Sequence, residues 1–423
     1  MENADPAPRT TFIKFYEGTY GITASSFEIL PKEGFVIVGT MVSDSTYTII
    51  ITTDKSGNRT KDFAKFSGGT GKAIKPIMNG DSIVTHYIVV GDSIKINPFA
   101  DQVANVTISS LRGLILSSDL TLVRKFAVAD LDPDTTRVKE DFTGEALKVT
   151  DDGRLFILGT AKKGVPNQVT APAEPFIKAF KSDFTKDWQK RYELNGRTSQ
   201  NSRSIQYSNG KIIWASAIAD ETGGFTNSWI GIPIIDENSV YPNYSVLGQN
   251  TAQKFVPKDI QPASEPSFGY GVVGTYSEDT DGSKGNIFFL RVYANGTIVP
   301  DSDRYFDGGE LLNTGNKLDD RKTSVTIDEG EALTATKDGG FVLAGTFKST
   351  SSIGNGGLDL FLIKVNALGD LVWFKTFGGA GDETPVAIHE DASGNLIVGG
   401  TNKLGDYATV FLMKTDKNGE LKK

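Results

Sequence analysis

The sequence predicts an all-β protein, a single β-propeller of seven blades. Three observations predict it: a four-strand pattern that repeats along the chain, a Gly-Thr pair that recurs at the end of the second strand of this pattern, and two chain ends that complement each other. The composition agrees, since the 423 residues include 46 glycines and 10% aromatic residues but no cysteine. Such a mixture suits many short strands joined by tight turns, without a disulfide or a thiolate metal site.

The clearest repeat runs from Glu331 to Gly379 and contains four strands. Its last two strands form a hairpin whose turn places Asn366 at the first position and Gly369 where a positive φ is needed. A meander of four strands is one propeller blade. The strands of this repeat are expected at residues 332–334, 341–345, 360–365 and 371–377.

The remaining blades follow from the same pattern. Three further good copies begin near residues 26, 145 and 382, and the Gly-Thr pairs mark five blades, at Gly39-Thr40, Gly159-Thr160, Gly274-Thr275, Gly345-Thr346 and Gly400-Thr401. The first two intervals between pairs, about 120 and 115 residues, are double intervals, so each must contain one degenerate blade. The seven blades are expected at residues 19–69, 70–130, 143–196, 197–250, 251–308, 328–379 and 380–423.

The two ends of the chain predict how the ring closes. The final copy stops at Lys423, where its fourth strand should begin, and residues 10–18 align with the fourth strand of the preceding blade. A blade of three strands would leave unpaired backbone groups at an open seam. We therefore expect the N-terminal strand to close the ring, with residues 1–9 as a tether and residues 10–423 as one domain.

The repeat at residues 338–346 and 359–383 reads DGGFVLAGT and DLFLIKVNALGDLVWFKTFGGAGDE. It resembles the repeats of exported bacterial seven-bladed β-propellers, surface lipoproteins of the Bacteroidetes type. The resemblance is strongest in residues 331–415, and it implies an extracellular or cell-envelope location rather than an activity. Residues 1–10 read like the tether that follows a removed export signal, so we expect possible membrane attachment through a lipid anchor that is absent from this sequence.

Charge and motif patterns exclude several functions. The net charge of −8 is spread along the chain, so no basic groove for nucleic acid is expected. Residues 68–72, GGTGK, resemble part of a phosphate loop, but Phe66 and Ala73 stand where Gly and Ser or Thr are required. The segment is better interpreted as a Gly-rich connection between blades.

Metal and cofactor chemistry has little support. Acidic residues within 277–286 could gather around Ca²⁺, but their spacing does not match the twelve-residue calcium loop, and a solvated turn is the favoured interpretation. His86 and His389 are the only histidines, so an all-His zinc site is impossible. Trp188 and Trp373 occupy one equivalent position in fourth strands, which indicates blade packing rather than the docking motif of a quinone-dependent dehydrogenase. We expect no metal, no cofactor and no catalytic residue.

The candidate binding site lies where fourth strands hand over to first strands. Acidic residues recur there, at Glu145, Glu331 and Asp382-Glu383, whereas the degenerate blades carry Lys72 and Arg203. Because first strands are innermost in a propeller, these residues should surround the axial opening, acidic on one side and basic on the other. His389, on a first strand, should pack or line the pore. The alternative is that each carboxylate only caps backbone amides of its own loop.

These observations favour a non-catalytic binding or scaffolding propeller at the bacterial cell surface, a monomer whose partner is a glycan or a protein. The alternative is a hydrolase or lyase that acts on extracellular polysaccharide. An enzyme of the hydrolase class requires paired carboxylates in the axial cleft, and the sequence cannot measure their separation.

Overall fold

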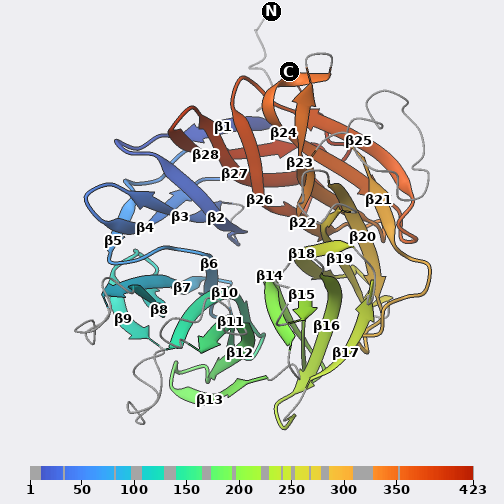
Figure 1. Cartoon of the computed structure of the whole chain (residues 1–423). Coiled ribbons are helices and arrows are strands. Elements are labelled where there is room, and N and C mark those ends of the chain that lie inside the picture. Colours follow the sequence, from blue (N-terminus) through green and yellow to red (C-terminus); the bar gives the residue numbers. More distant parts are fainter. Residues whose placement is uncertain are drawn as a thin grey trace, which may run out of the picture.

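Seven antiparallel sheets of four strands each surround a common axis (Figure 1). The computed structural model describes residues 11–31, 34–80, 82–96, 107–127, 140–163, 173–192, 197–220, 228–239, 242–248, 253–265, 268–277, 285–307, 327–350 and 353–422. The predicted seven-bladed β-propeller is confirmed. Within the described ranges, no helix is long and apolar enough to cross a membrane.

Each blade begins with the strand nearest the axis and ends with the strand at the rim (Figure 1). Blade 1 contains β2 (Ile22–Ile29), β3 (Phe35–Val42), β4 (Thr46–Thr53) and β5 (Ala64–Ser67). Blade 2 contains β6 (Ala73–Met78), β7 (Val84–Ile96), β8 (Thr107–Ser117) and β9 (Leu122–Ala127). Blade 3 contains β10 (Glu140–Val149), β11 (Leu155–Lys163), β12 (Ala173–Phe180) and β13 (Lys186–Arg191). Blade 4 contains β14 (Arg197–Ser208), β15 (Lys211–Asp220), β16 (Trp229–Asp236) and β17 (Asn243–Leu247).

The remaining blades follow the same order. Blade 5 contains β18 (Lys254–Pro262), β19 (Tyr270–Ser277), β20 (Asn286–Val292) and β21 (Arg304–Phe306). Blade 6 contains β22 (Asp328–Ala335), β23 (Phe341–Thr350), β24 (Ile353–Val365) and β25 (Leu371–Phe377). Blade 7 contains β26 (Asp382–Glu390), β27 (Leu396–Leu404), β28 (Tyr407–Thr415) and, as its fourth strand, β1 (Phe12–Tyr16).

Six blades lie within their predicted ranges, and blade 3 begins at Glu140, three residues earlier than expected. The first and second strands of blade 6 are also longer than the sequence pattern indicated, since β22 begins at Asp328 and β23 extends to Thr350. Residues 68–72 connect β5 to β6, as the Gly-rich interpretation predicted. Trp188 and Trp373 lie in the fourth strands β13 and β25.

The hydrophobic cores lie between neighbouring blades. One such core joins Phe27 and Ile37 of blade 1 to Ile397 and Val410 of blade 7. Because a blade is covered on both faces, its middle strands are buried over most of their length, as in the first five residues of β3, which are apolar and all buried. This explains why second and third strands appear in the sequence as continuous apolar runs instead of alternating ones.

The N-terminal strand closes the ring, as predicted. β1 is antiparallel to β28, with Phe12 opposite Lys414 and Tyr16 opposite Val410. The Tyr16 hydroxyl also donates a hydrogen bond of 2.8 Å to the Gly57 carbonyl of blade 1. The closing strand therefore contacts both blades at the seam. The predicted tether, residues 1–9, lies outside the described residues.

Candidate ligand site at the propeller axis

A β-bulge interrupts the first strand of six blades at an equivalent point. The register shifts fall between Ala24 and Ser26, Gly144 and Ala146, Asn201 and Ile205, Pro257 and Asp259, Gly330 and Ala332, and Pro385 and Ala387. In blade 2, Lys72 takes the same place immediately before β6. We call these residues the bulge ring: Ser25, Lys72, Glu145, Arg203, Lys258, Glu331 and Val386. A bulge turns a side chain out of the regular alternation of its strand, and such positions often border functional sites.

The glycine of the Gly-Thr pair makes room for the bulge. A Cβ on Gly39 would lie closer than 3.0 Å to the carbonyl oxygen of Thr23, and the equivalent glycines meet the equivalent carbonyls in five other blades: Gly91, Gly159, Gly274, Gly345 and Gly400. The first strand can therefore approach the second only where a side chain is absent. The recurring glycine in the sequence therefore marks the position of the bulge in each of these blades.

Side chains of the preceding blade hold several bulges in place. Thr40 Oγ1 accepts a hydrogen bond of 3.2 Å from the Gly71 N–H, and Thr401 Oγ1 accepts one of 2.9 Å from the Ala24 N–H. In blade 2 an aspartate replaces the threonine, and Asp92 Oδ1 accepts a bond of 2.9 Å from the Gly144 N–H. The bulge ring is consequently fixed by contacts between blades, which suits a preformed site.

Two neighbouring cavities lie against these residues. The larger, of about 340 Å³, is lined by Ala24, Ser25, Lys72, Glu145, Gln200, Arg203 and Val386. The second, of about 110 Å³, shares Ser25, Lys72, Arg203 and Val386 with the first and also contacts Glu331 and His389. The structure therefore brings together five predicted site residues: Lys72, Glu145, Arg203, Glu331 and His389.

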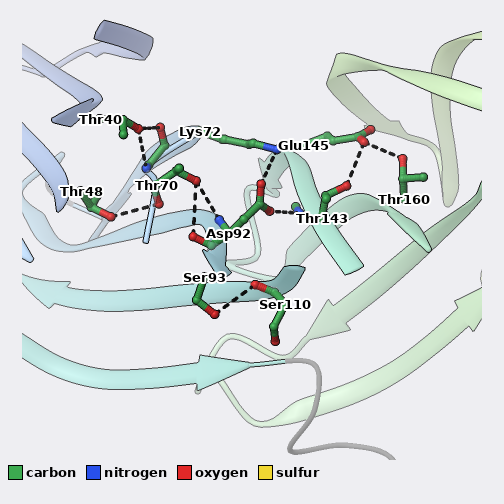
Figure 2. A network of polar contacts seen from close by, with 12 residues as sticks. Thr40, Thr48, Thr70, Lys72, Asp92, Ser93, Ser110, Thr143, Glu145 and Thr160 are labelled. Carbon is green, nitrogen blue, oxygen red and sulfur yellow. Dashed lines mark hydrogen bonds and ion pairs between the residues drawn. The ribbon is translucent and has the colours of Figure 1, made fainter. Parts of the chain in front are cut away.

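Figure 2 shows the polar network on one side of the larger cavity. Lys72 Nζ lies 2.5 Å from Asp92 Oδ2. Glu145 Oε1 accepts hydrogen bonds from the hydroxyls of Thr143, at 3.2 Å, and Thr160, at 2.5 Å. Two side-chain hydroxyls thus hold Glu145, whereas the alternative interpretation expected backbone amides of its own loop.

A second ion-pair group lies across the axis. Arg203 Nη1 is 2.8 Å from Glu331 Oε2, and Lys258 Nζ is 3.6 Å from Glu331 Oε1. Only 3% of the Glu331 side chain is exposed, whereas 46% of the Arg203 side chain is exposed. The carboxylate is enclosed by two cations, so this side of the ring does not present the negative charge that the sequence predicted. The bulge ring contains three cations and two carboxylates in total.

Asp382 and Glu383 are not among the residues that line either cavity. Asp382 Oδ1 accepts a hydrogen bond of 2.8 Å from the Leu358 N–H, and Glu383 Oε2 accepts one of 3.2 Å from the Gly379 N–H. The bond to Gly379 is of the kind that the alternative interpretation expected, whereas Leu358 lies on β24 of the preceding blade and not in the loop of Asp382. Burial raises the pKa of Glu383 to about 7, and the neighbouring carboxylates of Asp359 and Asp382 add to the increase.

The register explains why these two acids lie elsewhere. Pro385 pairs with Gly400 as Gly144 pairs with Gly159, so Val386, and not Glu383, is the bulge-ring residue of blade 7. The Gly-Asp-Glu triplet resembles the Gly-Glu pairs of other blades in sequence, but Gly381 stands four residues before Pro385, and Glu383 stands three residues before Val386.

His389 packs at the seam between blades 7 and 1. Its Nε2 lies 3.1 Å from the Phe27 carbonyl oxygen, and its ring meets the Phe27 ring edge to face at 4.8 Å between centroids. It also lines the second cavity, so both predicted roles, packing and pore lining, are combined. His86 lies on β7 and packs against the Phe184 ring.

Apart from His389, sequence reasoning missed a second ring of axial residues. Each lies three positions after a member of the bulge ring: Glu28, Lys75, Lys148, Gln206, Gln261, Thr334 and His389. All of them except Thr334 line the second cavity. The fixed spacing could have revealed them, but only once the bulged residue of every blade was known.

No group of three or more His, Cys, Asp or Glu side chains could hold a metal ion within the described ranges. The calcium candidate of the sequence, residues 277–286, falls largely on residues 278–284, which lie outside those ranges. The described site is thus built from ion pairs and hydrogen-bonding groups.

Comparison with known proteins supports the fold alone. No protein-family model and no curated protein matches the sequence. A protein of unknown function from Dyadobacter fermentans is similar in structure, with 10% identity, a TM-score of 0.51, and coverage of 96% of this chain and 98% of that chain. The polysaccharide lyase Uly1 is similar with 10% identity and a TM-score of 0.52, over 94% of this chain and 90% of that chain.

Proposed function

We propose that the protein is a non-catalytic binding propeller whose axial opening receives a glycan. The observation that carries this proposal is the larger cavity, because residues from five blades surround it and most of them present donors or acceptors. Its volume of about 340 Å³ lies at the lower end of the range of roughly 300–1,000 Å³ for ligand sites. Mixed polar lining of this kind suits a ligand with many hydroxyl groups.

The position of the partly exposed cations supports the same proposal. The side chains of Lys72 and Arg203 are 36% and 46% exposed, while their partners Asp92 and Glu331 are much more buried. Each cation is therefore anchored from one side and keeps further N–H donors for a ligand. Anchored donors lose little conformational freedom on binding, which improves affinity.

We also propose that the protein acts at the bacterial cell surface, attached through a lipid anchor that precedes residue 1. The support is the resemblance of the repeats to exported propellers and the polar character of residues 1–10. A propeller on such a tether would present its axial face to glycans outside the cell. Labelling of intact cells with an impermeant reagent, compared with lysed cells, tests this location.

Polysaccharide lyase activity is the second candidate. It is favoured by the shared fold of Uly1 and by Lys148 and His389 in the second cavity, since both side chains accept a proton when neutral. Hydrolysis has less support, because Glu145 is the single carboxylate among the residues that line the larger cavity, and glycoside hydrolysis generally uses two.

The test is a screen of the purified protein against polysaccharides, read for both binding and product release. Binding without new chain ends supports the proposed function, and release of unsaturated ends supports a lyase. Lys72→Gln and Arg203→Gln should each weaken binding, whereas Lys186→Gln, at an exposed position of the rim strand β13, should not. Binding that persists unchanged in both axial variants contradicts the axial site.

A further inference from the structure

Lys148 differs from the other cations that line the two cavities. Lys72 pairs with Asp92, Lys75 with Glu28, and Arg203 with Glu331. Lys148, on β10, has a hydrogen bond of 3.3 Å to the side-chain amide oxygen of Gln206. In the part of the chain that the structure describes, no carboxylate lies within ion-pair distance of its ammonium group.

The surroundings of Lys148 make this arrangement unfavourable for the free protein. Burial lowers the pKa of Lys148, and the positive charge of Lys75 lowers it further, while the negative charges of Glu28 and Asp151 oppose the change. A half-buried ammonium with a neutral partner is unfavourable, because it loses part of its hydration without gaining a counter-charge. An ammonium group in such surroundings is well placed to bind the anionic group of a ligand.

We propose that the axial site binds an acidic sugar whose carboxylate enters the second cavity and pairs with Lys148. This inference rests on the proposed glycan-binding function and specifies its ligand class. The second cavity, of about 110 Å³, exceeds several times the roughly 10–15 Å³ that one water needs, so it admits a carboxylate group. The sugar ring then occupies the larger cavity, where Ser25, Glu145 and Gln200 provide partners for its hydroxyls.

The cavities share residues that connect these two parts of the ligand. Lys72 and Arg203 line both, so their donors can reach the carboxylate as well as the ring oxygens. Charge-assisted hydrogen bonds from Lys and Arg to a carboxylate are roughly twice as strong as neutral ones. A neutral sugar of the same shape would leave Lys148 without its counter-charge.

The experiment compares glucuronate with glucose by isothermal titration calorimetry. The wild-type protein should bind glucuronate at least about tenfold more tightly than glucose, since a hydrogen bond to a charged group typically contributes that much. Lys148→Met should lose this preference, and Lys148→Arg should retain much of it. Lys186→Met, on the rim strand of the same blade, is the matched control and should bind like the wild type.

Thermal unfolding separates a ligand-binding role from a structural one. Removing a half-buried charge that has no counter-charge should leave the Tm of Lys148→Met unchanged or raise it, even though glucuronate binding is lost. If Lys148→Met does not fold, Lys148→Gln provides the same binding measurement. A lower Tm together with unchanged glucuronate affinity would show that Lys148 is structural and would overturn the inference.

Three other outcomes also overturn it. Equal affinity for glucose and glucuronate, or no affinity for glucuronate, excludes the acidic sugar while polysaccharide binding through Lys72 and Arg203 can still uphold the proposed function. Inorganic sulfate that binds as tightly as glucuronate shows an anion site without sugar recognition. If the wild-type protein binds no polysaccharide at all, the proposed function itself is contradicted.

Discussion

At two seams a threonine hydroxyl accepts a hydrogen bond from a backbone N–H of the following blade. Thr40 Oγ1 accepts a hydrogen bond from the Gly71 N–H, and Thr401 Oγ1 accepts one from the Ala24 N–H. Thr346 has the same place in blade 6, yet its buried hydroxyl has no hydrogen-bond partner among the described residues. Pro385 stands at the equivalent position of blade 7 and has no N–H to donate.

This difference predicts opposite results for one substitution at two equivalent sites. Thr401→Val should lower the free energy of unfolding by about 1–3 kcal/mol, because it leaves the Ala24 N–H without its acceptor. Thr346→Val should be neutral or stabilising, because it removes a buried hydroxyl that has no partner. Urea unfolding measures both. Equal losses in the two variants would contradict the role of Pro385.

Glu383 predicts a pH dependence of stability. Its pKa of about 7 in the folded protein exceeds the ordinary value of 4.5, so the folded state holds this proton more strongly than the unfolded state. The contribution to stability is complete below pH 4.5 and is lost as the pH rises through 7. Glu383→Gln cannot titrate, so its stability should increase relative to the wild type between pH 5 and pH 8.

Urea unfolding at the two pH values tests this prediction, with Glu17→Gln at an exposed position as the control. A constant difference between Glu383→Gln and the wild type would show that the carboxyl titrates in the same range in both states. A difference that changes with pH would also support a structural role for Glu383 rather than a role in ligand binding.

At the scale of the strand, the bulge and the facing glycine depend on each other. Blade 4 shows this dependence, because Ser216 stands where other blades have glycine and its register shift is spread over residues 202–204. A serine Cβ does not permit the close approach that Gly345 and its equivalents allow. The first strand of blade 4 therefore departs further from the second.

Gly345→Ala should accordingly destabilise the protein by about 1–3 kcal/mol, the usual cost of forcing an extra group into a packed region. The added Cβ would meet the Glu329 carbonyl oxygen, which is backbone and cannot rotate away. Gly80→Ala is the control, since nothing lies within 4 Å of its added Cβ. Thermal unfolding of both variants measures the difference, and equal Tm values would contradict the packing argument.

The same dependence explains what the sequence could predict. A glycine that must face a bulge recurs at one point of the repeat, so the marked blades were visible in the sequence. Blade 2 lacked the mark because Asp92 replaces threonine in accepting the neighbouring N–H. Val386 could not be found, because Pro385 takes the place of the glycine that would have marked the register of blade 7. Lys148 could not be found, because its position depends on the bulge at Glu145.

At the scale of the whole molecule, stability comes from packing between blades, so the ring is only as stable as its seam. The seam core contains Phe27, Ile37, Ile397 and Val410, and Thr11 Oγ1 adds hydrogen bonds to the backbone of Lys422. The complementary ends of the chain indicated this closure from the sequence. They could not show which side chains of the closing strand are buried.

The structure changes the expected contribution of that strand. Tyr16 is buried and Phe12 packs against the seam core, but 43% of Ile13 and 52% of Phe15 are exposed. The exposed pair lies on the other face of β1 and gains little from closure. Two side chains, and not four, therefore account for most of the apolar stabilisation by β1.

Deleting residues 1–18 should thus lower the free energy of unfolding by roughly 3–6 kcal/mol, at about 1.5–3 kcal/mol for each of Phe12 and Tyr16. The loss of pairing with β28 adds to this effect, because the backbone groups of that strand become an open edge. Deleting residues 1–8 alone should change nothing, since β1 begins at Phe12. In an intact protein, Phe12→Ala and Tyr16→Ala should each destabilise far more than Ile13→Ala or Phe15→Ala. Similar losses for all four variants in urea unfolding would show that β1 closes the ring by backbone pairing alone.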